Sequence, residues 1–234
     1  MNNTIKIFVA YHKWPVYFEN DNIIPIHVWK ANSKTNLWII WDDTGDNISD
    51  KNNDYAELTA QYWVRKNYDL SDVDYVWFCH YRRYITYQYK PKFFESIKLM
   101  YKEKKSNRDF LIRIIVHILW ICYTDSIKNI DKIKNNFIKL SLFLKHNKSN
   151  IFMSKKSIIL RSLHRLWIDN QQIWSIMEKI ILSKYPDYKL SLTELGQHKR
   201  FYFWNMFIMD VKSFKEYEEW LFNILFSFEK EIKK

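Results

Sequence analysis

A strand-like segment that ends in His80, Arg82 and Arg83 is the most telling chemical feature of the sequence. The preceding residues 74–79 read DYVWFC, and their β-branched and aromatic content favours a buried strand. Ligands of open α/β sheets bind beyond the carboxyl ends of the strands, and arginine matches phosphate oxygens with its planar fork. The spacing predicts that these side chains hold a nucleotide diphosphate. The alternative is that the arginines only pair with the acidic 42–54 loop.

A polar loop, residues 42–52, is the second feature with possible chemistry. The carboxylates of Asp42, Asp43 and Asp46 provide the oxygen ligands that divalent cations prefer, and they also suit ribose hydroxyls. The same residues, together with Gly45, are typical of an ordinary turn. The spacing matches no specific metal motif, so both interpretations stay open.

The composition disfavours several functional classes. Only 2 glycines occur among 234 residues, so neither a GxGxxG fingerprint nor a P-loop is present. Cys79 and Cys122 lack metal-ligand spacing and lie in apolar runs, which indicates buried thiols in a reducing compartment. The N-terminus leads into a strand-like segment without a signal peptide, so we expect a cytoplasmic protein.

The net charge of +11 is unevenly distributed. Residues 1–92 contain 11 basic and 11 acidic residues, residues 93–148 contain 12 and 5, and residues 149–234 contain 14 and 10. The basic middle suits an anionic membrane, nucleic acid or a phosphate-bearing substrate, although an AT-rich genome also yields a lysine-rich chain. Because the first 92 residues are neutral, a continuous basic groove is not evident, and nucleic-acid binding is the weaker alternative.

Strand-like and helix-like segments alternate, which predicts an α/β fold with a mainly parallel sheet flanked by helices. The expected strands comprise residues 5–10, 23–29, 37–41, 74–79, 150–154 and 203–210. The expected helices comprise residues 54–67, 166–184 and 213–233. Capping boxes are predicted at Asp54 with Glu57 and at Ser213 with Glu216.

Residues 92–147 are predicted to be helical, with a basic linker at residues 102–108. Asp109, Arg113 and His117 recur at helical spacing within an apolar run, which suits a deeply buried helix or one in a membrane interface. The run is too short and polar for a membrane span, which needs about 20 apolar residues. Residues 98–122 are the candidate contact with an anionic membrane surface, which would make the protein peripheral on the inner face of the cytoplasmic membrane.

Several blocks of the sequence together resemble the DUF4422 family. The resemblance is dense over residues 5–90 and looser over residues 150–228. The blocks are residues 7–13 (IFVAYHK), 44–52 (TGDNISDKN), 57–59 (ELT), 62–63 (YW), 80–84 (HYRRY), 205–209 (NMFIM) and 219–222 (EWLF). That family is associated with capsule, exopolysaccharide and lipopolysaccharide loci, and some members are described as galactosyl- or galactofuranosyltransferases.

The resemblance implies one GT-A-like domain over residues 1–234, with a nucleotide-sugar-binding half (1–92), a basic helical insertion (93–148) and an acceptor-side half (149–234). The donor-binding residues that it implies are Ala10, His12, Lys13, Asp46, Asn47, Lys51, Thr59, His80, Arg82 and Arg83. His164 and Asn205 are the expected contacts with the acceptor or the sugar. The candidates for the catalytic base are Asp46, His80, Glu194 and His198, and the sequence does not choose among them.

The implied reaction is transfer of a hexose, with galactose and galactofuranose as candidates, from a nucleotide sugar to a surface polysaccharide or lipopolysaccharide acceptor. A UDP-sugar is the favoured donor, and a glycan or lipid-linked acceptor is the expected partner. GT-A enzymes typically hold a metal with an Asp-x-Asp motif at a strand end, where this chain carries residues 80–83 (HYRR). We therefore expect positive side chains, rather than a divalent metal, to offset the charge of the leaving diphosphate.

Members of the family usually continue beyond the final helix into a charged tail. The alternative function, which the lack of that tail would favour, is that of a non-catalytic, membrane-associated partner in glycan assembly.

Overall fold

The computed structural model describes residues 4–13, 19–81, 83–85, 121–123, 151–153, 157–158, 171–197, 200–201 and 205–233. The chain separates into two compact units, of which the first comprises Met1–Lys155 and Trp204–Phe214, and the second Lys156–Phe203 and Lys215–Lys234. The division into a donor half, an insertion and an acceptor half within one domain stays a prediction.

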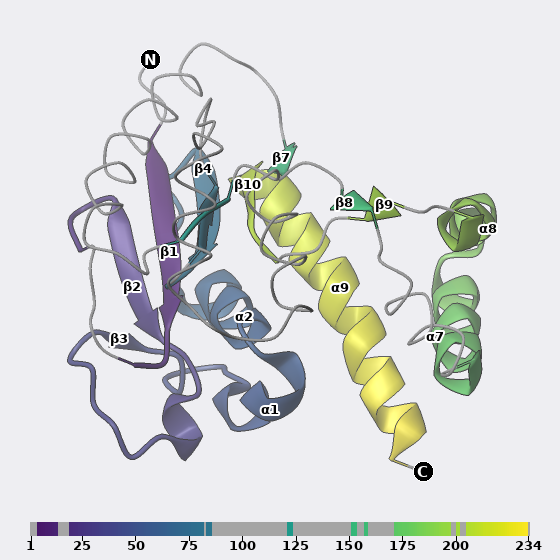
Figure 1. Cartoon of the computed structure of the whole chain (residues 1–234), viewed down its shortest axis with the longest axis horizontal. Coiled ribbons are helices and arrows are strands. Elements are labelled where there is room, and N and C mark those ends of the chain that lie inside the picture. The colour runs from purple at the N-terminus through teal and green to yellow at the C-terminus, as the bar shows by residue number, and fades with distance from the viewer. Residues whose placement is uncertain are drawn as a thin grey trace, which may run out of the picture. The chain divides into compact units, whose positions relative to one another are not determined.

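Four parallel strands form one side of the main sheet in the first unit. β1 (Ile5–Tyr11) lies between β2 (Ile23–His27) and β4 (Tyr75–His80), and β3 (Ile40–Trp41) pairs with the far side of β2 (Figure 1). β1 and β4 are buried over nearly their whole length. They are continuous apolar runs because parallel strands are covered on both faces. The predicted α/β fold with a mainly parallel sheet is therefore confirmed.

The other strands of this sheet join antiparallel to their neighbours. β10 (Phe207–Asp210) lies between β4 and β7 (Ile151–Met153) and is antiparallel to both. β5 (Arg83–Ile85) turns back from the end of β4 and pairs with β6 (Ile121–Tyr123). β6 corrects the helix predicted for these residues, because β5 offers its backbone groups a pairing partner that local propensity does not reveal.

The helix predicted over residues 54–67 is divided in two. A 3₁₀ turn, η2 (Ser49–Lys51), leads into α1 (Asn52–Tyr55), and α2 (Leu58–Asn67) follows. Ala56 separates the two helices because its backbone angles, φ 49° and ψ −132°, are not helical. Neither helix has a side-chain capping bond, so the capping box at Asp54 and Glu57 is wrong.

The second unit is built from helices and a small two-stranded sheet. Its elements are β8 (Ser157–Ile158), α7 (Gln171–Lys184), the 3₁₀ turn η4 (Pro186–Tyr188), α8 (Lys189–Gln197), β9 (Arg200–Phe201) and the part of α9 (Val211–Ile232) beyond Phe214. Ile181, Leu192 and Ile224 form its buried cluster, and Trp174 and Trp220 pack against them. α7 ends before Pro186, as predicted.

α9 begins earlier and by a different cap than the sequence suggested. The amide of Ser213 donates to Asp210 Oδ1 at 2.9 Å, so Asp210 supplies the cap. The predicted capping box of Ser213 with Glu216 is therefore wrong. The strand before the helix is also shorter than predicted, because β10 begins only at Phe207.

Two smaller predictions concern the thiols and the membrane. The thiol of Cys79 is buried, as predicted, whereas the side chain of Cys122 lies outside the described residues. Within the described ranges, no helix combines the length and apolar character needed to cross a membrane. Most of residues 98–122, the predicted membrane contact, likewise falls outside these ranges.

Candidate functional site

The carboxyl ends of β1 and β4 bring together two of the sequence blocks singled out above. Ala10 pairs with His80 across the two strands, and the Tyr81 amide donates to the Ala10 carbonyl at 3.0 Å. His12 and Lys13 follow β1 directly, so they lie at the same edge of the sheet as His80. This is the edge at which open α/β sheets bind ligands.

Aromatic contacts position the two imidazoles at this edge. The rings of His12 and His80 lie 4.7 and 4.6 Å from the Tyr81 ring, and their own centroids are 6.5 Å apart. Lys13 Nζ lies 5.6 Å from the Tyr81 ring centroid. Tyr81 is buried, whereas His12 and Lys13 are exposed. The edge thus presents one ammonium group and two imidazoles, which are able to donate hydrogen bonds to phosphate oxygens.

The backbone of β5 returns to the same place. Arg83 pairs with His80 across the antiparallel turn between β4 and β5, so only Tyr81 and Arg82 separate the paired residues. The side chain of Arg83 and all of Arg82 lie outside the described residues. The pairing places the Arg83 backbone beside His80, and the diphosphate contact of both arginines stays a prediction.

A pocket opens between this edge of the sheet and the start of α2. Its polar lining comes from Glu57, Gln61, His80 and Asn205. Its apolar lining comes from Phe8, Ala10, Ala60, Phe78, Cys79 and Met206. The enclosed volume is about 10 Å³, room for about one water molecule, and the pocket opens to solvent.

Gln61 is the most buried polar residue of this pocket, with 1 % of its surface exposed. Its Nε2 donates to the Asn205 carbonyl at 2.9 Å, and this contact fixes which end of the amide faces which way. Its buried Oε1 has no hydrogen-bond partner among the described residues. Because an unsatisfied buried acceptor costs free energy, Gln61 Oε1 is a candidate contact for a ligand hydroxyl.

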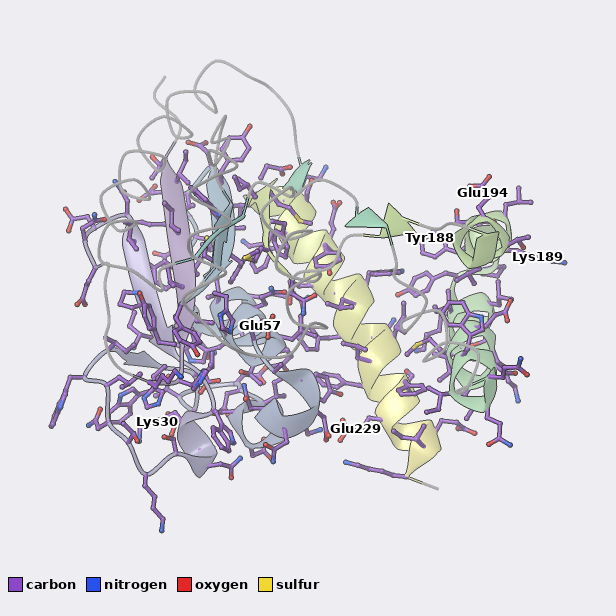
Figure 2. All side chains as sticks on the ribbon, in the orientation of Figure 1. Lys30, Glu57, Tyr188, Lys189, Glu194 and Glu229 are labelled. Atoms are coloured by element: carbon purple, nitrogen blue, oxygen red, sulfur yellow. The ribbon has the colours of Figure 1, made fainter. Side chains whose placement is uncertain are left out.

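Glu57 and Gln61 are pocket residues that sequence reasoning did not assign to the site. Glu57 is half-buried and makes no capping hydrogen bond, and Figure 2 labels it beside α2. Residues four positions apart share a helix face, so the sequence alone indicates that Glu57 and Gln61 lie on the same side of a helix. Their position near β4 depends on the break at Ala56 and on β10 pairing with β4, for which the sequence offers no local signal.

Asp42 is fully buried, and its carboxylate accepts four hydrogen bonds. Oδ2 accepts from the Trp29 amide at 3.2 Å and the Thr59 hydroxyl at 2.7 Å. Oδ1 accepts from the Lys30 amide at 3.2 Å and the Ser49 hydroxyl at 2.5 Å. A carboxylate has about four lone-pair sites, so these donors occupy them. Asp42 and Thr59 therefore have a structural role, and the predicted donor contact of Thr59 stays a prediction.

The loop that follows Asp42 is joined to α2 through a close backbone approach. Gly45 has φ +58°, and a Cβ at this position would lie 2.1 Å from Asn67 Oδ1. Asn67 accepts from the Asp46 amide at 3.0 Å and donates to the Asp46 carbonyl at 2.8 Å. Both the backbone angle and the close approach of Asn67 explain why glycine occupies position 45.

Asp46 itself is tied to α2 by two side chains. Oδ2 lies 2.8 Å from Lys66 Nζ, and Oδ1 accepts from the Tyr62 hydroxyl at 2.9 Å. The hydrogen bonds from Lys66 and then Tyr62 hold the pKa of Asp46 below its ordinary value. A lower pKa makes this carboxylate a weaker general base. Its predicted catalytic and donor-binding roles are not tested by these contacts.

The neighbours of Asp46 in the same block also make local contacts. The Asn47 side chain donates to the Gly45 carbonyl at 3.0 Å and accepts from the Ser49 amide at 3.2 Å. Lys51 is half-buried at the end of η2. The predicted donor contacts of Asn47 and Lys51 stay predictions. Across the described ranges, no group of three or more His, Cys, Asp or Glu side chains is placed to hold a metal ion.

His27 ends β2 and is fully buried. Neither of its ring nitrogens has a hydrogen-bond partner among the described residues. Burial, with a smaller contribution from the charge of Lys30, lowers the pKa of His27 below its ordinary value. The imidazole is therefore neutral at pH 7, because the neutral form is the one that tolerates desolvation.

The remaining predicted site residues are spread over both units. Asn205 is exposed and precedes β10, and Glu194 is exposed on α8 of the second unit (Figure 2). His164 and His198 lie outside the described residues. Their predicted roles as acceptor contact and as base stay predictions.

Comparisons with known proteins place this geometry in context. The family described as a domain of unknown function (DUF4422) matches residues 6–234. Among solved structures, the chain is similar to the apo structure of the bifunctional glycosyltransferase WbbM, with 26 % sequence identity and a TM-score of 0.72. The similarity covers 97 % of this chain and 37 % of that one, so this chain spans little more than a third of WbbM. The GT-A-like fold class is thereby confirmed. A search of the curated proteins found no match.

Proposed function

Because the chain belongs to the DUF4422 family, we propose that it is a glycosyltransferase that moves a hexose from a nucleotide sugar, preferably a UDP-sugar, to a bacterial surface glycan. The acceptor is a growing polysaccharide or lipopolysaccharide, free or lipid-linked. The similarity to a bifunctional glycosyltransferase supports glycosyl transfer in general. The observation that carries the proposal is the cluster of His12, Lys13 and His80 beside a pocket with an unsatisfied Gln61 oxygen.

In this proposal the diphosphate lies against His12, Lys13 and His80, with Arg83 next to His80 along the backbone pairing. Cleavage of the bond between the sugar and the diphosphate leaves an additional negative charge on the leaving group. Positive groups already in position lower the free energy of the transition state, because they need no reorganisation when that charge develops. The negative charge of the leaving diphosphate has to be matched by positive charge, and in this proposal the side chains supply it without a bound metal.

The sugar ring lies at the open mouth of the pocket, where one of its hydroxyls reaches the polar groups of the lining. Gln61 Oε1 accepts a hydrogen bond from this hydroxyl, and the buried oxygen thereby gains the hydrogen-bond donor that it lacks among the described residues. The acceptor hydroxyl loses its proton during transfer, and Glu57 and His80 are the carboxylate and the imidazole that line the pocket, beside the buried thiol of Cys79. Both are better placed for this role than Asp46, whose lowered pKa makes it the weaker base.

Calorimetric titration with UDP, GDP, CMP and their hexose derivatives tests the proposal. We expect one nucleoside diphosphate to bind, and the dissociation constant to rise about tenfold or more in Lys13→Ala and Arg83→Ala, since each removes a positive charge from the diphosphate. Lys6→Ala is the matched control, because Lys6 lies near the amino end of β1, the opposite end from Lys13, where its ammonium donates to the Asp21 carbonyl.

Two results contradict the proposal. Equal losses of affinity in the control and in the two site variants would show that overall charge, rather than this edge, determines binding. No release of nucleoside diphosphate from any sugar nucleotide, even with a mixture of glycan acceptors, would contradict transferase activity. Activity that disappears with EDTA and returns with manganese would refute the metal-independent part alone.

A further inference from the structure

The segment between β2 and β3 exposes an unusual number of large apolar side chains. Eight such side chains are exposed among the described residues, and four of them lie between residues 29 and 41. We call these four, Trp29, Trp38, Ile40 and Trp41, the tryptophan surface. Trp38 is 81 % exposed and Trp29 is 38 % exposed. Exposed apolar side chains gathered in one region mark a site of interaction, whereas scattered ones need no explanation.

The backbone at two of these positions adopts a strained conformation, and at Trp38 burial of the side chain offsets little of that strain. Trp29 has φ +64° and Trp38 has φ +55°, the left-handed region that glycine and asparagine adopt most readily. The third described non-glycine residue with positive φ is Ala56, at the break between α1 and α2. Burial of an indole ring is able to offset such strain, but the Trp38 side chain is 81 % exposed. The fold therefore does not explain tryptophan at position 38.

Hydrogen bonds and one buried side chain fix the backbone of the segment that carries the tryptophan surface. The Asp42 carboxylate accepts from the backbone amides of Trp29 and Lys30. The 3₁₀ turn η1 (Lys30–Asn32) is joined to η2 by the Ala31 amide, which donates to Ser49 Oγ at 3.1 Å, and by the Asn32 side chain. Leu37 is fully buried and anchors the far part of the segment. The exposed rings are thus presented on a fixed frame, which reduces the entropy lost on binding.

The charge of the segment indicates the partner. Residues 28–41 contain Lys30 and Lys34 and no acidic residue. Lys30 Nζ lies 5.0 Å from the Trp41 ring centroid, so one positive charge sits directly beside an exposed indole. Tryptophan rings favour the headgroup level of a bilayer, and lysines beside them are attracted to anionic lipids. A neutral glycan would match the rings but would leave the lysines without a counterpart.

We infer that the tryptophan surface docks on an anionic phospholipid bilayer. Trp29 follows the carboxyl end of β2 and Trp41 ends β3, so the surface belongs to the same edge of the sheet as His12 and His80. Docking there holds the candidate site close to the membrane plane. This surface is separate from residues 98–122, and the inference does not rest on the proposed transferase activity.

Vesicle flotation with the full chain tests the inference. Vesicles of phosphatidylcholine with phosphatidylglycerol are compared with vesicles of phosphatidylcholine alone. We expect binding to the anionic vesicles, and a loss of about tenfold or more in Trp29→Asn/Trp38→Asn, because two indoles no longer leave water. Lys34→Ala should weaken binding about fivefold and only on anionic vesicles. Asparagine tolerates a left-handed backbone better than tryptophan, so the double variant should fold normally.

Leu190→Asn is the matched control, because Leu190 is 77 % exposed on α8 and lies outside the tryptophan surface. It should float like the original protein, and all variants should keep the urea midpoint and the nucleotide affinity of the original. The inference is overturned if the original protein does not float with anionic vesicles, or if the double variant floats equally well. It is also overturned if the tryptophans instead govern oligosaccharide binding or self-association in the absence of lipid.

Discussion

Replacement of Gly45 by alanine should destabilise the first unit through its contact with Asn67. The added Cβ would lie 2.1 Å from Asn67 Oδ1, so the asparagine side chain has to move. That movement breaks its hydrogen bonds to the amide and carbonyl of Asp46, at 3.0 and 2.8 Å. Alanine also has to adopt φ +58°, which favours glycine.

The expected loss is the sum of these effects. Two hydrogen bonds at about 1 kcal/mol each and a left-handed alanine at about 1 kcal/mol predict a decrease of about 3 kcal/mol in the unfolding free energy. Asn67→Ala removes these two hydrogen bonds and the one to the Trp63 carbonyl at 3.1 Å without a clash, and we expect a loss of about 2–3 kcal/mol. In the Asn67→Ala background, Gly45→Ala should cost only about 1 kcal/mol, because there is no asparagine left to displace.

Urea unfolding of the four proteins measures this cycle, and nucleotide titration of each folded variant completes it. If the two substitutions are additive, the contact between Gly45 and Asn67 does not determine the stability of this loop and the argument is refuted. Unchanged nucleotide affinity supports a structural role for the loop. A selective loss of affinity in Gly45→Ala, with little loss of stability, would instead favour the donor contacts predicted for Asp46 and Asn47.

Two other substitutions test buried groups near the same edge. Asp42→Asn should lower the unfolding free energy, measured by urea unfolding, by about 2–4 kcal/mol, because the new amide nitrogen cannot accept from the two donors that face it. A change below about 0.5 kcal/mol would contradict the network of four donors around Asp42. The lowered pKa of His27 means that the unfolded chain binds more protons than the folded one between the folded pKa and about 6.5, so stability should fall as the pH decreases through that window. Urea unfolding at several pH values should show a weaker dependence in His27→Phe, and an unchanged dependence would mean that other groups cause it.

The two central parallel strands of the first unit, β1 and β4, were predictable because their burial leaves a direct mark on the sequence. Both strands are covered on both faces, and for this reason each is a continuous apolar run in the sequence. The end of β4 was equally visible, since His80 and the arginines interrupt such a run. These features depend on neighbouring residues alone, which is why they were predicted at nearly the correct boundaries.

Features that depend on distant residues were not predictable. Gln61 and Asn205 meet across 144 positions of sequence, and nothing near either residue indicates the contact. β6 forms because β5 is available as its partner. The capping boxes failed for a related reason, since Asp210 at the end of β10 was better placed to cap α9 than Ser213. Local patterns thus identified the edge of the sheet, but not the side chains that complete the pocket.

The position of β10 has a consequence for synthesis of the protein on the ribosome. β10 lies inside the sheet, between β4 and β7, although more than a hundred residues separate it from β4 along the chain. Until residue 210 has left the exit tunnel, the outer edge of β4 has no β10 to pair with. An unpaired strand edge of this kind invites aggregation. The pocket beside Asn205 is therefore completed only after β10 has been translated and has paired with β4.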